Sequence, residues 1–231
     1  MRRQTMRTHS RSTDFRFALR AVLPLLLLTL PLTGCARPVP NLWETRRAIE
    51  EYHDSGRYEA DVRAAADAAR AYMESRLAEG AARPALVLDV DETSLSEFAF
   101  SRSRGFCYDK AAFDAEEREA RLPAVAPVRD LASWAAGRGI AVFFVTGRPD
   151  ALCPATRENL ANAGFPEPAG VRCRPAGVPH SPAEAWKSSA RKAIEAEGYD
   201  ILVTMGDQES DLSGGFAERG FKLPNHVYFI P

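Results

Sequence analysis

Aspartates follow two apolar stretches of the chain, at the point where each stretch ends. Asp89 and Asp91 come directly after one apolar run, and Asp207 comes directly after another, with Asp211 four positions further on. A short apolar run closed by polar residues is typical of a buried parallel strand. A carboxylate at such a position can attack an electrophile, transfer a proton or bind a cation. These four residues are therefore the first candidates for chemistry.

A third apolar run, AVFFV, ends in Thr146 and Gly147. In open parallel sheets, ligands bind in the crevice beyond the carboxyl ends of the strands, so we expect the three strand ends to converge on one site. A single acid at a strand end is more often a cap or a turn residue. Three strand ends that all carry polar residues favour a functional site instead.

The carboxylates of Asp89, Asp207 and Asp211 would repel one another unless a cation lay among them. Ligands that are all oxygen favour Mg²⁺ over a transition metal. The histidines are scattered along the chain and form no pair at the spacing of zinc ligands. We therefore expect one Mg²⁺ per chain.

Helices and strands alternate along the chain in a way that would position these residues. Strands are expected at 85–93, 140–148, near 171–175, at 199–207, at 221–223 and at 226–230, and helices at 43–53, 62–77, 127–139, 149–163 and 181–198. Asn41 is expected to cap the first helix, and Ser181 to begin the last one with Pro182 in its first turn. This alternation predicts an α/β fold: an open parallel, Rossmann-like sheet with helices on both faces and two additional helices at the N-terminus.

Five sequence motifs resemble those of a known family. DVDET at 89–93 resembles the first motif of the haloacid dehalogenase-like superfamily, and VTGR, the lysine of WKSSARK and GDQESDL resemble its other three motifs in the correct order. Together with FKLPN, they are similar to the pattern of the exported DDDD-type bacterial acid phosphatases (classes B and C) and of the related plant acid phosphatases and vegetative storage proteins. The resemblance covers residues 42–231 and implies a phosphatase domain with a cap inserted at about 94–123.

The resemblance implies a role for each motif residue. Asp89 would attack phosphorus and form an aspartyl-phosphate, which divides one displacement into two. Asp91 would protonate the leaving alcohol and then deprotonate water. Thr146, Gly147 and Lys187 would bind the phosphoryl oxygens.

The same resemblance implies the ligands of the cation. They would be the Asp89 carboxylate, the backbone carbonyl of Asp91 and Asp207, with Asp211 binding directly or through water. Lys192 competes with Lys187 for the role of the third motif. We prefer Lys187, because it lies near the N-terminus of its helix, where the helix dipole also favours phosphate.

The cap segment is rich in aromatic residues. We expect Phe98 and Tyr108 to stack on a nucleobase or an aryl leaving group, although aromatic residues in a cap can equally form its small core. Related proteins have asparagine where this chain has Glu97, and this difference falls in the region that selects the substrate.

The N-terminus reads as a targeting segment. Arginines precede a proline-interrupted apolar run that is too short for a comfortable membrane span, and the run ends in LTGC at Cys35. The segment resembles a bacterial lipoprotein signal: a leader at 1–34, an acylated Cys35 and a Pro-rich tether at 35–41. A plain secretory signal is the alternative. With Ala36 after the cysteine, the resemblance implies an exported protein anchored in the outer membrane and facing the periplasm or the cell surface.

Removing residues 1–34, which hold six Arg and one Asp, changes the formal charge from −1 to −6. The mature chain is therefore acidic and lacks a basic stripe, so a nucleic-acid polymer is not expected as a partner, whereas small phosphomonoesters are. In an exported protein a disulfide is plausible. We expect Cys153 to pair with Cys173, because the first would begin a helix and the second would end a strand at the same sheet edge. Alternatively, the cysteines are small buried apolar residues.

The sequence leaves two other functions open. A phosphotransferase would use the same intermediate, with an alcohol in place of water. A non-catalytic storage or binding relative is also possible, as in plant members of the family that lack the nucleophile. The presence of both Asp89 and Asp91 favours a catalyst.

Overall fold

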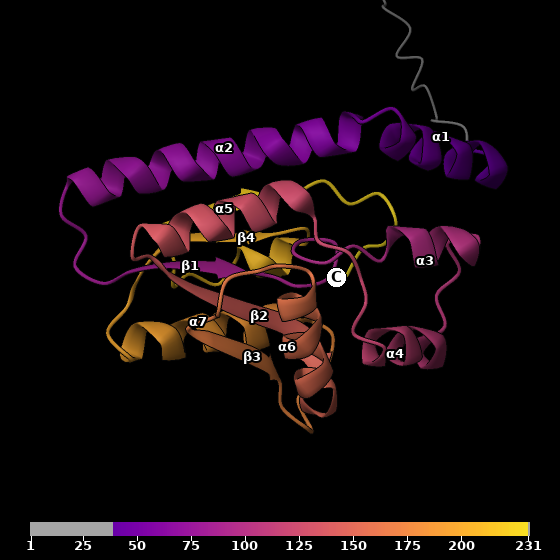
Figure 1. Ribbon diagram of the computed structural model, residues 1–231. Helices are drawn as coiled ribbons and strands as arrows, with labels where there is room; N and C mark the ends of the chain where they lie inside the picture. The colour runs from indigo at the N-terminus through magenta and orange to yellow at the C-terminus, as the bar shows by residue number, and fades with distance from the viewer. Residues whose placement is uncertain (1–38, 231) are drawn as a thin grey trace, which may run out of the picture. The chain divides into compact units, whose positions relative to one another are not determined.

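A five-stranded parallel sheet organises the fold in the computed structural model, which describes residues 39–230 (Figure 1). Its strands lie in the order β3-β2-β1-β4-β5, and all neighbouring pairs are parallel. They comprise β1 (Pro84–Leu88), β2 (Ala141–Pro149), β3 (Gly170–Arg174), β4 (Asp200–Gly206) and β5 (Arg219–Lys222). This arrangement confirms the predicted fold class.

The register of the central strands aligns the ends that carry the candidate residues. Leu88, the last residue of β1, pairs with Phe144 in β2 and with Met205 in β4. The backbone N–H of Asp89 donates to the carbonyl of Met205 at 2.9 Å, so the pairing continues into the first acidic residue. The polar residues that follow these strands therefore come out at one edge of the sheet.

Helices cover both faces of the sheet because successive strand residues point to opposite sides. Leu86 and Leu88 join a core with α2 and α5, whereas Ala85 and Val87 join a second core with α7. The long helices are α1 (Leu42–Asp54), α2 (Arg57–Ala78), α5 (Ala126–Gly137), α6 (Cys153–Asn162) and α7 (Glu184–Ala196). Two shorter helices, α3 (Phe98–Ser103) and α4 (Lys110–Arg118), lie in the segment between β1 and α5, and the single turns η1 (Asp150–Leu152) and η2 (Glu209–Asp211) follow β2 and β4.

The first described helix begins where the sequence predicts. The Asn41 side chain accepts hydrogen bonds from the backbone N–H of Trp43 at 2.9 Å and of Glu44 at 3.4 Å, which satisfies two donors at the free end of α1. The leader at 1–34, Cys35 and most of the tether lie outside the described residues. Within 39–230, no helix is both long and apolar enough to cross a membrane.

Two local predictions were wrong. Helix α7 begins at Glu184 rather than at Ser181 and has no side-chain cap. The predicted strand at 226–230 does not form, because side chains take up its backbone N–H groups: Val227 donates to the Asn225 amide oxygen at 2.7 Å, and Ile230 donates to the Gln208 amide oxygen at 3.0 Å.

Cys153 and Cys173 are joined by a disulfide, with their Cα atoms 5.9 Å apart. The bridge links the start of α6 to β3, as the expected pairing required. Cys107 is exposed and has a free thiol.

Candidate active site

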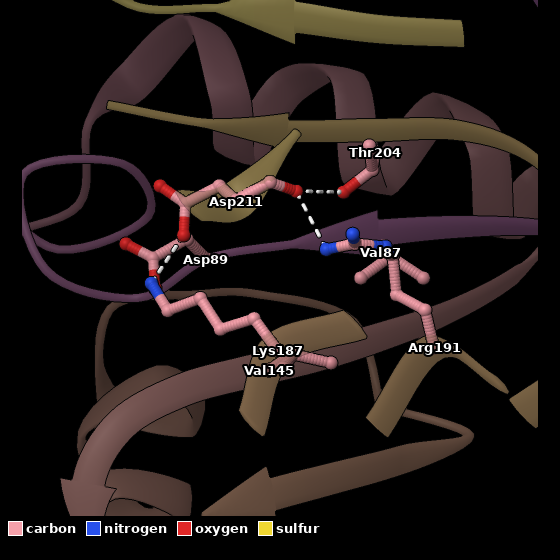
Figure 2. Close-up of a pocket in the computed structure, with 7 residues that line it drawn as sticks. All are labelled: Val87, Asp89, Val145, Lys187, Arg191, Thr204 and Asp211. Carbon is pink, nitrogen blue, oxygen red and sulfur yellow. Dashed lines mark hydrogen bonds and ion pairs between the residues drawn. The ribbon is translucent and has the colours of Figure 1, made fainter. Parts of the chain in front are cut away.

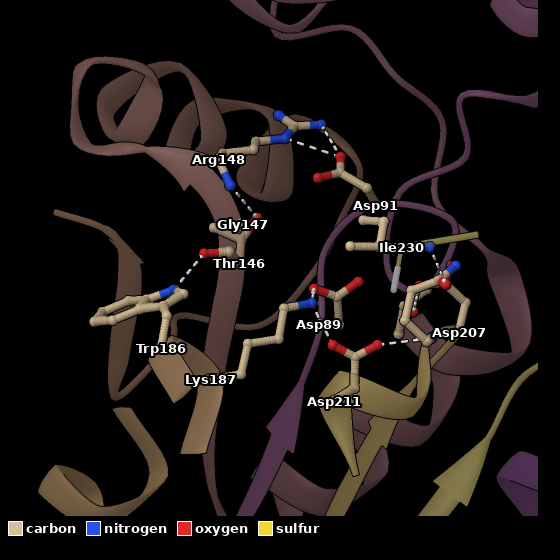
Figure 3. Close-up of polar contacts among 12 residues, drawn as sticks. Asp89, Asp91, Thr146, Gly147, Arg148, Trp186, Lys187, Asp207, Asp211 and Ile230 are labelled. Atoms are coloured by element: carbon tan, nitrogen blue, oxygen red, sulfur yellow. Dashed lines mark hydrogen bonds and ion pairs between the residues drawn. The ribbon is translucent and has the colours of Figure 1, made fainter. Parts of the chain in front are cut away.

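Three carboxylates and one lysine form what we call the inner cluster: Asp89, Asp207, Asp211 and Lys187. Asp89 directly follows β1, Asp207 directly follows β4, and the turn η2 brings Asp211 back toward both (Figure 3). One carboxylate oxygen from each aspartate lies within 4.8 Å of the others, and each of the four residues is at most 5% exposed. The close approach of Asp211 requires Gly206, because a Cβ there would overlap the Asp211 side chain. The structure thus brings together the carboxylates that the sequence singled out.

Lys187 reaches the inner cluster from α7. Its Nζ donates to Asp89 Oδ1 at 2.7 Å and also to Asp211 Oδ1. Burial alone would lower the pKa of Lys187, but the carboxylates of Asp89 and Asp211 more than offset it, so the ammonium form is strongly favoured. Lys192, by contrast, is exposed, with Nζ 5.8 Å from the ring centroid of Phe216. Of the two lysines, Lys187 is therefore the one that contacts the inner cluster.

Hydrogen-bond donors surround Asp207. Thr93 Oγ1 donates to its Oδ1 at 3.1 Å, and the Gln208 and Asn225 amides donate to its Oδ2 at 2.5 and 2.7 Å. Lys222 donates to its backbone carbonyl at 2.6 Å. Burial and the neighbouring Asp211 nevertheless raise the pKa of Asp207, since these donors offset them only in part.

Four further residues lie beside the inner cluster: Val87, Val145, Thr204 and Arg191 (Figure 2). The Nη1 of Arg191 donates to the Asp211 carbonyl at 2.7 Å. Thr204 Oγ1 donates to the same carbonyl at 3.0 Å. These contacts fix the turn that presents the Asp211 carboxylate.

The inner cluster fits a divalent metal ion. Burial first, and then the Asp211 carboxylate, raise the pKa of Asp89 well above its ordinary value, while Lys187 opposes the rise. Three carboxylates and one ammonium leave two negative charges, which a divalent cation would balance. Buried carboxylate oxygens are also the ligands that hard divalent cations prefer.

Asp91 lies in a second group of charges, which we call the outer cluster: Asp91, Glu97, Glu117 and Arg148. The Arg148 guanidinium donates to Asp91 Oδ1 from Nε at 2.9 Å and from Nη2 at 2.5 Å (Figure 3). Arg148 is also 4.0 Å from Glu97 Oε1 and 3.8 Å from Glu117 Oε2. The carboxylates of Asp89 and Asp91, two positions apart in the chain, thus belong to different surroundings.

The outer cluster is less enclosed than the inner one. The side chains of Asp91 and Glu117 are 21% and 12% exposed, whereas that of Glu97 is 7% exposed. Burial, followed by the Asp91 carboxylate, raises the pKa of Glu117 to about 7 and that of Glu97 well above its ordinary value. Negative charge in this cluster therefore exceeds what Arg148 stabilises.

Thr146 and Gly147 line the same edge from β2. Thr146 is fully buried: its hydroxyl oxygen accepts a hydrogen bond from the Arg148 N–H at 3.1 Å, and its carbonyl accepts one from Trp186 Nε1 at 2.9 Å. A Cβ on Gly147 would lie 3.4 Å from the His180 ring, which is an ordinary van der Waals distance. The backbone here is held close to its neighbours.

The two cap aromatics differ in their surroundings. Phe98 is half-buried and stacks on His53 of α1 with ring centroids 3.6 Å apart, and His53 stacks in turn on Tyr58 at 4.1 Å. Tyr108 is 73% exposed and packs against Phe113. In the described part of the chain, neither ring stacks on or hydrogen-bonds to a residue of the inner cluster.

Several residues of the site were not assigned from the sequence. Arg148, Lys222 and Asn225 stand inside the quoted motifs VTGR and FKLPN, so those motifs carried information that was not used. Glu97 was noted only as a departure from relatives. Glu117 lies on α4 in no motif, and only the folded cap brings it to Arg148.

The parallel sheet, together with an aspartate cluster and a lysine at the carboxyl ends of its strands, defines an α/β enzyme of the haloacid dehalogenase-like class. Residues 39–231 match the family described as HAD superfamily, subfamily IIIB (acid phosphatase), and the chain belongs to this family. It is an acid phosphatase, a hydrolase of phosphomonoesters.

Known relatives and structures agree with this assignment. Acid phosphatase 1 of Solanum lycopersicum is 32% identical over 186 residues, covering 79% of this chain and 73% of the relative. The stem 28 kDa glycoprotein of Glycine max is 28% identical over 193 residues, covering 81% and 75%. The class C acid phosphatase from Bacillus anthracis has a similar fold, with a TM-score of 0.68, 21% identity and coverage of 81% and 86%.

Proposed function

We propose that the chain hydrolyses small phosphomonoesters through an aspartyl-phosphate formed on Asp89. The observation that carries this proposal is the separation of the two motif carboxylates: Asp89 contacts Lys187 in the inner cluster, whereas Asp91 contacts Arg148 in the outer one. A nucleophile must face the phosphorus atom, and a proton donor must face the leaving oxygen. Two carboxylates in different surroundings suit these two roles.

In the first step, an Asp89 oxygen bonds to phosphorus as the bond to the leaving oxygen breaks, and Asp91 gives that oxygen its proton. In the second step, Asp91 takes a proton from water, which attacks phosphorus and releases phosphate from Asp89. Lys187, Thr146 and Gly147 hold the phosphoryl oxygens throughout. Because Lys187 already contacts Asp89, its charge is in place before the substrate arrives.

One Mg²⁺ per chain completes the proposed site. The carboxylates of Asp89 and Asp207 and the backbone carbonyl of Asp91 would hold it, with Asp211 binding directly or through water. When bound, the cation neutralises charge on the phosphoryl group. The acidic inner cluster supports this proposal, and its oxygen ligands favour Mg²⁺.

Hydrolysis of a panel of phosphomonoesters with added Mg²⁺, and with EDTA, tests both parts of the proposal. We expect activity with Mg²⁺, its loss in EDTA and its return when Mg²⁺ is added back. If EDTA leaves the rate of hydrolysis unchanged, the proposal of a bound Mg²⁺ is wrong, but the assignment of phosphatase activity is not affected.

Nucleoside monophosphates are a proposed substrate class. The supporting observation is the stack of Phe98, His53 and Tyr58, in which Phe98 directly follows Glu97 of the outer cluster in the chain. An aromatic face there suits a nucleobase. Hydrolysis of nucleotides and of sugar phosphates, compared in the same preparation, tests this choice.

We also propose that the protein is exported and anchored by lipid at Cys35, with residues 35–41 as a tether between an outer-membrane surface and the catalytic domain. The LTGC sequence supports this location. Labelling of expressed protein with radioactive palmitate should depend on Cys35, and a Cys35→Ala chain should be unlabelled. Label that persists in this variant would overturn the proposal.

A further inference from the structure

The outer cluster holds more carboxylates than its single cation can satisfy. Among the described residues, Arg148 is the one basic group within salt-bridge distance of Asp91, Glu97 or Glu117. Both of its short contacts go to one oxygen of Asp91. Its distances to Glu97 and Glu117, 4.0 and 3.8 Å, are too long for hydrogen bonds. Two carboxylates are thus left without a close cationic partner.

Glu97 gives an independent indication that a ligand binds here. Its Oε1 is buried and has no hydrogen-bond partner in the described part of the chain, and the residue is 5% exposed. A buried acceptor without a donor is costly and uncommon in native proteins. An N–H donor from a ligand would satisfy it.

The geometry suits one small cation. One oxygen each from Asp91, Glu97 and Glu117 lies within 4.8 Å of the other two. Three atoms so spaced can all lie about 2.8 Å from a single point, which is an ordinary N–H···O distance. A primary ammonium has three donors, one for each carboxylate.

We propose that the outer cluster binds an ammonium group on the leaving alcohol, so that the enzyme prefers aminoalkyl phosphates to neutral alkyl phosphates of the same size. This inference rests on the proposed function, because Asp91 as proton donor places the leaving oxygen beside the cluster. The side chains of Asp91 and Glu117 are partly exposed to solvent, and that of Glu97 is more buried.

A second divalent cation fits the cluster less well. A metal ion bound to the Asp91 carboxylate would withhold that group from proton transfer. An ammonium group can donate to Asp91 and still leave its second oxygen free.

The test compares 2-aminoethyl phosphate with propyl phosphate, which has the same number of heavy atoms and no charge on its alkyl group. We expect kcat/KM to be at least about tenfold higher for the amine, because its ammonium group would form hydrogen bonds to charged partners. Glu97→Gln and Glu117→Gln should each lower this ratio by about tenfold. Glu119→Gln, a neighbouring acid with a 57% exposed side chain, should leave the ratio unchanged. Because each ratio is measured within one preparation, partial loss of folded protein cancels.

A measurement on the unmodified protein removes dependence on the variants. 3-Aminopropylphosphonate, in which a CH₂ replaces the ester oxygen, should inhibit at least about tenfold more strongly than butylphosphonate. Equal inhibition by the two phosphonates, or equal hydrolysis of the two esters by active enzyme, would overturn the proposed ammonium subsite. It would not affect the assignment of phosphatase activity. Loss of a bound Mg²⁺ equivalent in Glu97→Gln would also overturn it, in favour of a metal site. If Asp89→Asn retained full activity, the proposed function itself would fail.

Discussion

The inner and outer clusters each contain three carboxylates and one basic side chain, but they differ in how far hydrogen bonds within the chain satisfy those carboxylates. In the inner cluster Lys187 bonds two carboxylates, and amide and hydroxyl donors bond the third. In the outer cluster Arg148 bonds one carboxylate, and a buried oxygen of Glu97 has no partner. The first arrangement holds its groups in fixed positions, whereas the second leaves a place for a ligand group.

The difference follows from the structural elements that carry the residues of each cluster. The inner cluster is built from the ends of two central strands and one helix packed on the sheet, so its positions follow from the register of the core. Glu97 and Glu117 lie in the segment between β1 and α5, outside the sheet. The part of the site that acts on every phosphoryl group thus sits on rigid elements, while the part that meets the variable leaving group sits on an insertion.

Asp89→Asn should have the largest effect, a loss of at least about a thousandfold in kcat for every substrate, because an amide cannot form the acyl-phosphate. The similar shape should leave thermal melting close to that of the original protein. Asp67→Asn, on the exposed side of α2, is the matched control. Beryllofluoride should bind at Asp89 in a crystal of the original protein. Substantial turnover in pure Asp89→Asn would remove the inner cluster from the chemistry.

Lys187→Ala should follow, with kcat/KM lowered by roughly a hundredfold for charged and neutral leaving groups alike. The reason is that Lys187 meets the phosphoryl group, which all substrates share. Lys192→Ala, an exposed residue on the same helix, should change little. A Lys187→Ala effect confined to one class of leaving group would contradict the division of labour between the clusters.

The sequence predicted the inner cluster because its residues follow apolar strands, whose ends must meet in a parallel sheet. Asp89, Asp207 and Thr146 were found in this way. Lys187 was found from the resemblance of WKSSARK to the third motif of the family, and its place near the start of a helix favoured it over Lys192. The number of strands around them also followed from the alternation of helices and apolar runs, apart from the extra strand expected at 226–230.

The outer cluster did not follow from the sequence, because no local periodicity relates Glu97, Glu117 and Arg148. Their contact depends on how α3 and α4 fold back over the sheet edge. The failure at 226–230 has a similar origin: the pattern suggested a strand, but Asn225 and Gln208, both beside Asp207, bind that backbone instead.

Phe98→Ala should have an intermediate effect, lowering kcat/KM for nucleoside monophosphates by roughly tenfold, since stacking on one base contributes about 1–3 kcal/mol. Tyr108→Ala, which removes an exposed ring of the same segment, should have less effect than Phe98→Ala. Aminoalkyl phosphates have no nucleobase to stack on these rings, so both variants should hydrolyse them at the original rate. If Phe98→Ala lowers kcat/KM equally for all substrates, or lowers only the melting temperature, the ring serves to pack α1 against α3.

Glu117→Gln should change the pH dependence of stability. The pKa of Glu117 is about 7 in the folded chain, against 4.5 ordinarily, because burial and Asp91 oppose its charge. A raised carboxyl pKa means that the folded state binds the proton more tightly than the unfolded state. The stability this group contributes is therefore complete below about pH 4.5 and is lost as the pH rises through about 7.

Thermal melting of the metal-free protein tests this prediction. Glu117→Gln and the original chain should be equally stable near pH 4.5. Near pH 8 the variant should be more stable by up to about 3 kcal/mol, which raises the melting temperature by several degrees. Glu119→Gln should follow the original chain at every pH. Parallel curves for Glu117→Gln and the original chain would mean that Arg148 satisfies the outer cluster fully, and the contrast with the inner cluster would disappear.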